Sequence, residues 1–290
     1  MTALAARLTW GLVPAVPVPF RGREIAADAQ RSYARWMAAQ PVAGVAVWAH
    51  TGRGPHLSEA QRQAVLAAWR EALADRPIVA GATSPEMARS ALAGGADAVL
   101  AFPRTDDAVG YHEALGRELP VIAFFLYEAA GGAPYDDATL RAILGLPAVI
   151  GIKVATLDSV VTFQRIAAIA RDFPDKLLIT GEDRFLGYSL MLGARAALVG
   201  MGAALTDLQV QLIQAHRDRD WVTFLRLTSL FDAVGSTLFD VPVEGYVRRM
   251  LWALAADGVV PPDACDDPWG PPLSAAERRA VEGAVREARR

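Results

Sequence analysis

The sequence predicts an α/β protein, a (β/α)8 TIM barrel with an appended C-terminal helical region. Within the first 217 of its 290 residues, eight short apolar or β-branched segments alternate with eight amphipathic segments. Several of the short segments are apolar at nearly every position, which is typical of parallel strands covered by helices on both faces. An open doubly wound sheet is the alternative fold, and the count of eight β-then-α units favours the closed barrel.

The expected strands are short and rich in apolar residues. They lie at 11–18, 43–49, 77–81, 97–101, 120–127, 148–153, 176–180 and 196–200. Segments 121–126 and 148–152 carry no charged or polar side chain, so we place both between covering layers of helices.

Amphipathic periodicity predicts the helices that connect these strands. They lie at 26–39, 58–74, 84–94, 106–117, 136–145, 156–172, 183–192 and 202–217. Three of them carry start signals. Ser58 and Gln61 form a capping box, Ser84 precedes a proline at the first helical position, and Asp106 or Asp107 can cap the fourth helix.

The chain divides into a barrel domain at 1–217 and a helical extension at 218–290. The extension holds three more helical patterns, near 219–236, 242–256 and 274–288. A proline-rich stretch at 259–272 separates the last two.

Composition narrows the class of partner and the compartment. Hydrophobic residues make up 53% of the chain, the net charge is −3, and no basic stripe is present, so nucleic acid is not an expected partner. Pro14, Pro17 and Pro19 interrupt the apolar start of the chain, and no uncharged apolar run approaches the roughly 20 residues that span a bilayer. The single cysteine, Cys265, excludes an intramolecular disulfide. We expect a soluble cytoplasmic protein.

A lysine at a strand end is the leading catalytic candidate. Active sites of such barrels lie at the C-terminal ends of the strands, and Lys153 ends the sixth one. Val149, Gly151 and Lys153 share one face of a regular strand. If that face is the interior, desolvation lowers the lysine pKa, and the neutral amine can attack a ketone to form a Schiff base. The alternative is a lysine that extends to solvent or pairs with an acid.

Two hydroxyl groups are expected near this lysine. Tyr127 ends the neighbouring strand, where its phenol can relay a proton or simply pack. Thr51 lies beside Gly52 and Gly54, and a hydroxyl with free backbone N–H groups can bind a carboxylate, although a plain turn has the same composition.

The order of these motifs resembles a known family. The segments that carry the resemblance are Pro17-Val18-Pro19-Phe20, Ala49-His50-Thr51-Gly52-Arg53, Gly94-Gly95-Ala96-Asp97-Ala98, Leu126-Tyr127, Gly151-Ile152-Lys153, Gly181-Glu182-Asp183 and Pro242-Val243. In this order and spacing the chain resembles, from end to end, the dihydrodipicolinate synthase / N-acetylneuraminate lyase family of Schiff-base pyruvate aldolases.

The resemblance implies a role for each matching residue. Lys153 is the Schiff-base nucleophile and Tyr127 the proton shuttle. The carboxylate of the keto acid binds Thr51 and nearby amides, including that of Gly52. The substrate contacts implied at the last two strand ends are Gly181, Asp183 and the backbone near Leu198, with Asp183 meeting sugar hydroxyls.

Several positions depart from the family pattern. No arginine follows Tyr127 within 127–134, where the synthase branch binds its second substrate's carboxylate. The stretch 102–105 lacks a tyrosine that the family contributes across a dimer interface, and Arg104 is an alternative anion contact there. His50 replaces a hydroxyl residue of the proton relay, as either a new relay group or a space filler. Glu128 replaces an asparagine and Arg53 a glutamate.

These observations predict a class I aldolase or dehydratase. Its substrate is a 2-keto-3-deoxy sugar acid or a related 2-oxo acid, with pyruvate as donor or product, and the protein is a homotetramer or homodimer by the same resemblance. The alternatives are 4-hydroxy-tetrahydrodipicolinate synthase activity and an impaired member that only binds keto acids. A metal-dependent aldolase is disfavoured because no two of the four histidines sit at ligand spacing, and Gly200-Met201-Gly202 is too weak a nucleotide motif. No metal or cofactor is expected.

Overall fold

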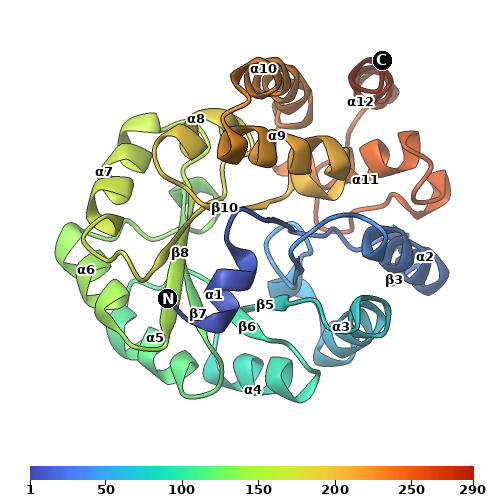
Figure 1. Cartoon of the computed structure of the whole chain (residues 1–290). Helices are drawn as coiled ribbons and strands as arrows, with labels where there is room; N and C mark the ends of the chain where they lie inside the picture. The colour runs from blue at the N-terminus through green and yellow to red at the C-terminus, as the bar shows by residue number, and fades with distance from the viewer.

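Eight parallel strands close into a barrel that a ring of helices surrounds (Figure 1). A computed structural model describes all 290 residues. The strands are β1 (Leu12–Pro14), β4 (Val45–Val47), β5 (Ile78–Ala82), β6 (Ala98–Ala101), β7 (Val121–Leu126), β8 (Val149–Ala155), β9 (Leu177–Thr180) and β10 (Ala196–Val199). Their spatial order is β1-β10-β9-β8-β7-β6-β5-β4, and a parallel bridge between Ala15 and Ala46 closes the ring. The predicted barrel is confirmed, and all eight expected strands are present.

The connecting helices also follow the sequence pattern. They are α2 (Ala27–Ala38), α3 (Glu59–Leu73), α4 (Pro85–Ala93), α5 (Ala108–Gly116), α6 (Asp137–Gly145), α7 (Val160–Ala170), α8 (Leu186–Met191) and α9 (Thr206–Asp218). The capping box of Ser58 and Gln61 forms at the start of α3, and the Ser84 side chain caps α4. Asp107, rather than Asp106, caps α5 by accepting a hydrogen bond from the backbone of Gly110.

Two elements are absent from the sequence prediction. A short helix, α1 (Ala3–Leu8), precedes β1, and a hairpin joins β2 (Phe20–Arg21) to β3 (Glu24–Ile25). Ala5 and Leu8 of α1 pack into the apolar cluster inside the barrel, and α1 crosses the middle of the barrel in Figure 1. The helix α1 has six residues and each strand of the hairpin has two, which is too few to show a helical or an alternating period. These elements are therefore stabilised by tertiary packing.

A shift in strand register determines which side chains of β8 point inward. Between β7 and β8 the pairing changes from Val121–Val149 to Ile122–Gly151, which leaves Ile150 as an extra residue. Lys153 then pairs with Phe124, a member of the interior cluster, whereas Val149 packs in the outer core under the helices. The expectation that Val149 shares the face of Lys153 is therefore wrong, because the extra residue at Ile150 interrupts the alternation of a regular strand.

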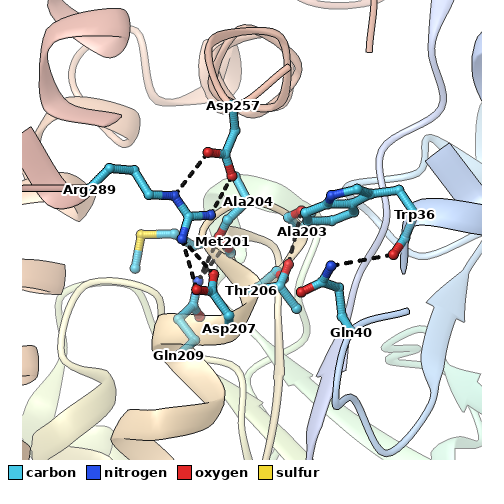
Figure 2. Close-up of polar contacts among 11 residues, drawn as sticks. Trp36, Gln40, Met201, Ala203, Ala204, Thr206, Asp207, Gln209, Asp257 and Arg289 are labelled. Carbon is cyan, nitrogen blue, oxygen red and sulfur yellow. Dashed lines mark hydrogen bonds and ion pairs between the residues drawn. The ribbon is translucent and has the colours of Figure 1, made fainter. Parts of the chain in front are cut away.

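The C-terminal extension packs on one side of the barrel (Figure 1). It consists of α10 (Trp221–Leu238), α11 (Tyr246–Ala256) and α12 (Ala275–Ala288). Figure 2 shows how its end is attached: Arg289 lies between Asp257, which follows α11, and Asp207 in the first turn of α9. Its guanidinium donates to Asp257 at 2.9 Å and to Asp207 at 2.8 Å. This charge cluster joins the tail to the last barrel helix.

No single helix is long and apolar enough to cross a membrane, although the sharply bent pair α10 and α11 together meet the length and composition criteria.

Candidate active site

A small cavity opens at the C-terminal ends of the strands. Its lining residues are His50, Thr51, Phe124, Leu126, Tyr127, Lys153, Ala155, Leu157, Gly181, Glu182, Asp183, Gly200, Phe239 and Tyr246. Six of the nine predicted site residues lie in this lining: Lys153, Tyr127, His50, Thr51, Gly181 and Asp183. The fold thus brings together residues from the ends of five strands (β4, β7, β8, β9 and β10) and from the C-terminal extension.

Lys153 is buried with its amine free. Only 6% of the residue is exposed, and Nζ lies 4.2 Å from the centre of the Phe124 ring, with no carboxylate within ion-pair distance. Burial lowers the pKa of Lys153 to about 8, against the opposing charges of Asp183 and Glu182. A substantial neutral fraction therefore exists near physiological pH, as a nucleophilic amine requires.

A glycine makes room for this side chain. A Cβ atom at Gly181 would lie 2.6 Å from Cε of Lys153 and 2.9 Å from Cβ of Ala155. Any other residue at the end of β9 would displace the lysine stem. By contrast, a Cβ at Gly151 would meet the backbone oxygen of Leu177 at 2.4 Å, so that glycine lets β8 approach β9 and does not enlarge the cavity.

The two acids after β9 are held by backbone amides rather than by the lysine. Glu182 is 1% exposed and accepts hydrogen bonds from the amides of Thr156 at 2.6 Å and Leu157 at 3.1 Å. Asp183 accepts one from the amide of Met201 at 2.6 Å. Burial raises the pKa of Glu182 to about 7 and that of Asp183 to about 6. These acids fix the loops around the lysine while leaving its nitrogen unpaired.

A three-membered hydrogen-bonded group forms opposite the lysine. The hydroxyl of Tyr246 lies 2.8 Å from Nδ1 of His50 and 3.2 Å from Oγ1 of Thr51. Burial, with help from the charges of Arg53 and Lys153, lowers the pKa of His50 to about 4, so its ring is neutral at pH 7. From the sequence, Tyr246 is only one of several aromatic residues in 221–255 that could pack or form an interface. Its place in the cavity depends on the fold of the tail.

Arg53 forms a buried ion pair with the tail. Its Nε donates to Oδ1 of Asp267 at 3.0 Å, and its Nη2 donates to Oδ2. The Arg53 side chain is 8% exposed and that of Asp267 is 1% exposed. The positive charge introduced in the loop after β4 is therefore matched by Asp267, and it serves to tie that loop to the extension.

Three predicted residues lie outside the cavity lining. Arg104 pairs with Asp106 at 2.8 Å and packs over the Tyr111 ring. Leu198 is fully buried in the interior cluster of the barrel, and Gly52 lies against the backbone of Val16. Roles for Arg104, for the Gly52 amide and for the backbone near Leu198 stay predictions.

The barrel holds a buried, unpaired lysine in a cavity with hydroxyl groups at the C-terminal ends of its strands, which is an arrangement suited to nucleophilic attack on a carbonyl. No family model matches the chain. It is 30% identical over 190 residues to the 4-hydroxy-tetrahydrodipicolinate synthase of Ruegeria pomeroyi, covering 60% of this chain and 63% of that protein, which is less than two thirds of its length. It is 24% identical over 265 residues to the same enzyme of Synechococcus elongatus, covering 84% and 87%.

A solved structure extends the likeness to the whole fold. YagE from E. coli K12, a prophage protein of the dihydrodipicolinic acid synthase family in complex with pyruvate, superposes with a TM-score of 0.86, at 19% identity and covering 96% of this chain and 98% of that one. The chain is thus similar over most of its length to proteins named 4-hydroxy-tetrahydrodipicolinate synthase, and its fold is that of solved structures of the dihydrodipicolinate synthase family and of N-acetylneuraminate lyase.

Proposed function

We propose that this protein is a Schiff-base lyase that cleaves or dehydrates a 2-keto-3-deoxy sugar acid or a related 2-oxo acid. The observation that carries the proposal is the Lys153 amine, which is buried, unpaired and lowered in pKa, in one cavity with Tyr127 and Thr51. An amine in this state is the nucleophile that imine formation needs.

The reaction can be written with this lysine alone as the covalent group. The neutral amine adds to the C2 ketone, the carbonyl oxygen leaves as water, and a protonated imine remains. A base takes the proton of the C4 hydroxyl, the C3–C4 bond breaks, and its electron pair moves into an enamine of pyruvate as an aldehyde departs. Protonation at C3 and hydrolysis then release pyruvate. In a dehydratase, C3 loses a proton and the C4 hydroxyl leaves as water instead.

The surroundings of the cavity favour a hydroxylated substrate over one with a second carboxylate. A larger pocket of about 390 Å³ adjoins the cavity and shares Leu126 and Tyr127 with it. Hydroxyl groups line it from Thr156, Ser159 and Thr162. Its only arginine, Arg165, is already engaged by Asp137 and by the backbone of Tyr135. A carboxylate here would lack the bidentate partner that such groups normally find.

Trapping with borohydride tests the proposal. Incubation with pyruvate and sodium borohydride should add the mass of one reduced pyruvate unit per chain. Turnover of a panel of keto-deoxy acids, followed by pyruvate release, then identifies the substrate. An unchanged mass with every keto acid would contradict the Schiff base, and trapping without any turnover would indicate a protein that only binds keto acids.

A second candidate is 4-hydroxy-tetrahydrodipicolinate synthase activity. It is favoured by the names of the curated relatives. Condensation of pyruvate with aspartate semialdehyde, followed spectroscopically, separates the two candidates. Rapid turnover of that aldehyde would replace the sugar-acid proposal, and its absence alongside cleavage of a keto-deoxy acid would support it.

Adduct formation should depend on pH through Lys153. Only the neutral amine attacks, so the rate at saturating borohydride should fall roughly tenfold per pH unit below about 8 and level off above it. Asp183→Asn should move this midpoint to lower pH, because the negative charge of Asp183 raises the pKa of Lys153. A midpoint close to the ordinary lysine value of 10.5 would show that the amine is hydrated.

Removing the hydroxyl of Tyr127 should slow the reaction without preventing adduct formation. Burial raises the pKa of Tyr127 to about 12, so the phenol stays protonated and can act as a proton donor at the cavity wall. In Tyr127→Phe we expect a loss of about 10²-fold in kcat, with trapping still complete at long times. Single-turnover trapping measures both. An unchanged rate would limit Tyr127 to packing.

We also propose that the protein associates into dimers or tetramers. One face near the start of α10 exposes Trp221 (49%), Val222 (82%) and Leu225 (61%), which is consistent with an apolar contact surface. Sedimentation of the native chain and of a Val222→Glu, Leu225→Glu variant measures the state. A native monomer would contradict the proposal.

A further inference from the structure

We propose that Tyr246, supplied by the chain's own helix α11, is a proton-relay residue that links His50 to Thr51 and serves the reaction at Lys153. The inference rests on the proposed Schiff-base function and goes beyond it. It assigns a role in the chemistry to a residue of the C-terminal extension.

The geometry holds the Tyr246 hydroxyl at one point. Tyr246 is 5% exposed, and its ring stacks on Phe239, with centroids 5.0 Å apart and planes at 14°. Its ring is also nearly parallel to that of His50, at 6°. Gly200 lies underneath, where an added Cβ would come within 3.0 Å of Thr51 Oγ1 and 3.5 Å of Tyr246 Cε2. The hydroxyl is therefore placed by packing on several sides.

The hydrogen-bonding capacities of the three groups fit a relay. A tyrosine hydroxyl donates one hydrogen bond and accepts others, as does a threonine hydroxyl, and Nδ1 of a neutral imidazole either donates or accepts. The hydrogen bonds of the group can therefore run in either of two directions, here called its two polarities. In one, Thr51 donates to Tyr246 and Tyr246 donates to His50; in the other, both bonds are reversed. A proton that enters at one end and leaves at the other converts the first polarity into the second.

The chemistry at Lys153 needs proton donors and acceptors beyond the lysine itself, and such a path supplies them beside Tyr127. When the amine condenses with a ketone, the departing oxygen gains two protons. One comes from the amine nitrogen, and the other must be delivered from elsewhere. Lys153 has no proton donor bonded to it, and Thr51 and Tyr246 line the same cavity. The chain His50–Tyr246–Thr51 is the connected set of neutral donors that reaches this cavity.

The relay also compensates for a departure in the sequence. The stretch 102–105 holds no tyrosine, and Arg104 there pairs with Asp106 away from the cavity. Tyr246 provides a phenol from within the same chain. His50, Tyr246 and Thr51 all belong to one chain, so this relay does not depend on the state of association.

The test uses the exchange of pyruvate methyl protons for deuterium, followed by NMR in D2O. This exchange requires the imine and the enamine but no second substrate. In Tyr246→Phe, which keeps the ring and its stacking, we expect the exchange rate to fall by about 10²-fold. The pyruvate concentration at half-saturation should change by less than about threefold, because the substitution keeps the contacts that bind pyruvate before it reacts. The matched control is Tyr111→Phe, which also removes a buried hydroxyl, here one that donates to the backbone of Ala82 outside the cavity. This control should exchange at the wild-type rate.

Two further measurements separate a relay from a structural role. The exchange rate of His50→Ala should fall about as far as that of Tyr246→Phe. The double variant should exchange no more slowly than either single variant, since one break already interrupts the relay. Fluorotyrosine at 246 keeps the shape and changes the acidity of the hydroxyl, so it should alter the exchange rate severalfold even if Tyr246→Phe does not fold. Exchange in Tyr246→Phe within twofold of wild type, or no effect of fluorination, would overturn the proposal. A wild-type protein that neither traps nor exchanges pyruvate would instead defeat the proposed function itself.

Discussion

In Lys153→Ala, borohydride should trap no pyruvate on the protein. The chain contains only two lysines, Lys153 and Lys176, among its 29 basic residues. Lys176 lies just before β9, at the opposite end of the barrel from the cavity, where its amine donates to the backbone of Leu146 at 3.1 Å and lies 3.4 Å from Asp175. An amine held in this way, outside the cavity, is not placed to attack a bound ketone. The mass of the intact protein after reduction therefore reports on Lys153 with little background.

Two matched variants complete this experiment. Lys176→Ala should trap pyruvate as the wild type does, because it leaves the cavity unchanged. Lys153→Arg keeps a cation at the site but supplies a group that remains protonated, so it should trap nothing. A full adduct in Lys153→Ala would remove Lys153 from its assigned role, and peptide mapping would then locate the amine that reacts.

Breaking the Arg53–Asp267 pair should produce the largest loss of stability from a single substitution near the site. Both side chains are more than nine-tenths buried, and their two hydrogen bonds join the loop after β4 to the C-terminal extension. Removing one partner leaves an uncompensated charge in a poorly hydrated region. Arg53→Met or Asp267→Asn should therefore lower the free energy of unfolding by about 3–5 kcal/mol. Urea denaturation followed by circular dichroism measures the change.

The double variant and a surface pair serve as controls. Arg53→Met with Asp267→Leu should cost less than the sum of the single variants, since no charge is then left unpaired. Asp172→Asn breaks the exposed pair of Arg141 and Asp172 and should change stability by less than about 1 kcal/mol. Additive losses from the buried pair, or losses as small as the surface control, would contradict this account.

The barrel itself is predictable from the sequence because its signals are local. Each strand buries both faces, so its apolar character is visible within a few residues, as in 121–126. Several helices carry their own period and cap, as α3 does with Ser58 and Gln61. Residues at the ends of strands then converge for a topological reason, which is why Lys153, Tyr127 and Thr51 meet in one cavity.

The missing parts depend on contacts between distant residues. The hydrogen bond from His50 to Tyr246 spans 196 positions of the chain, and the pair of Arg53 and Asp267 spans 214. No periodicity or short motif encodes such a pairing. The shift at Ile150 is another case, because a bulge depends on how β8 is paired with β7 and changes the facing of every residue before it.

The partners of His50 and Arg53 constrain how this protein can diverge. A recombination event at the junction of residues 217 and 218 would give the barrel a foreign tail, and with it a different residue opposite His50 and no acid opposite Arg53. The progeny would lose the Tyr246 phenol from the cavity and leave Arg53 buried without its counter-ion in one step. Lineages of this protein should therefore inherit the two segments as a linked pair, with compensating changes at 50 and 246 and at 53 and 267.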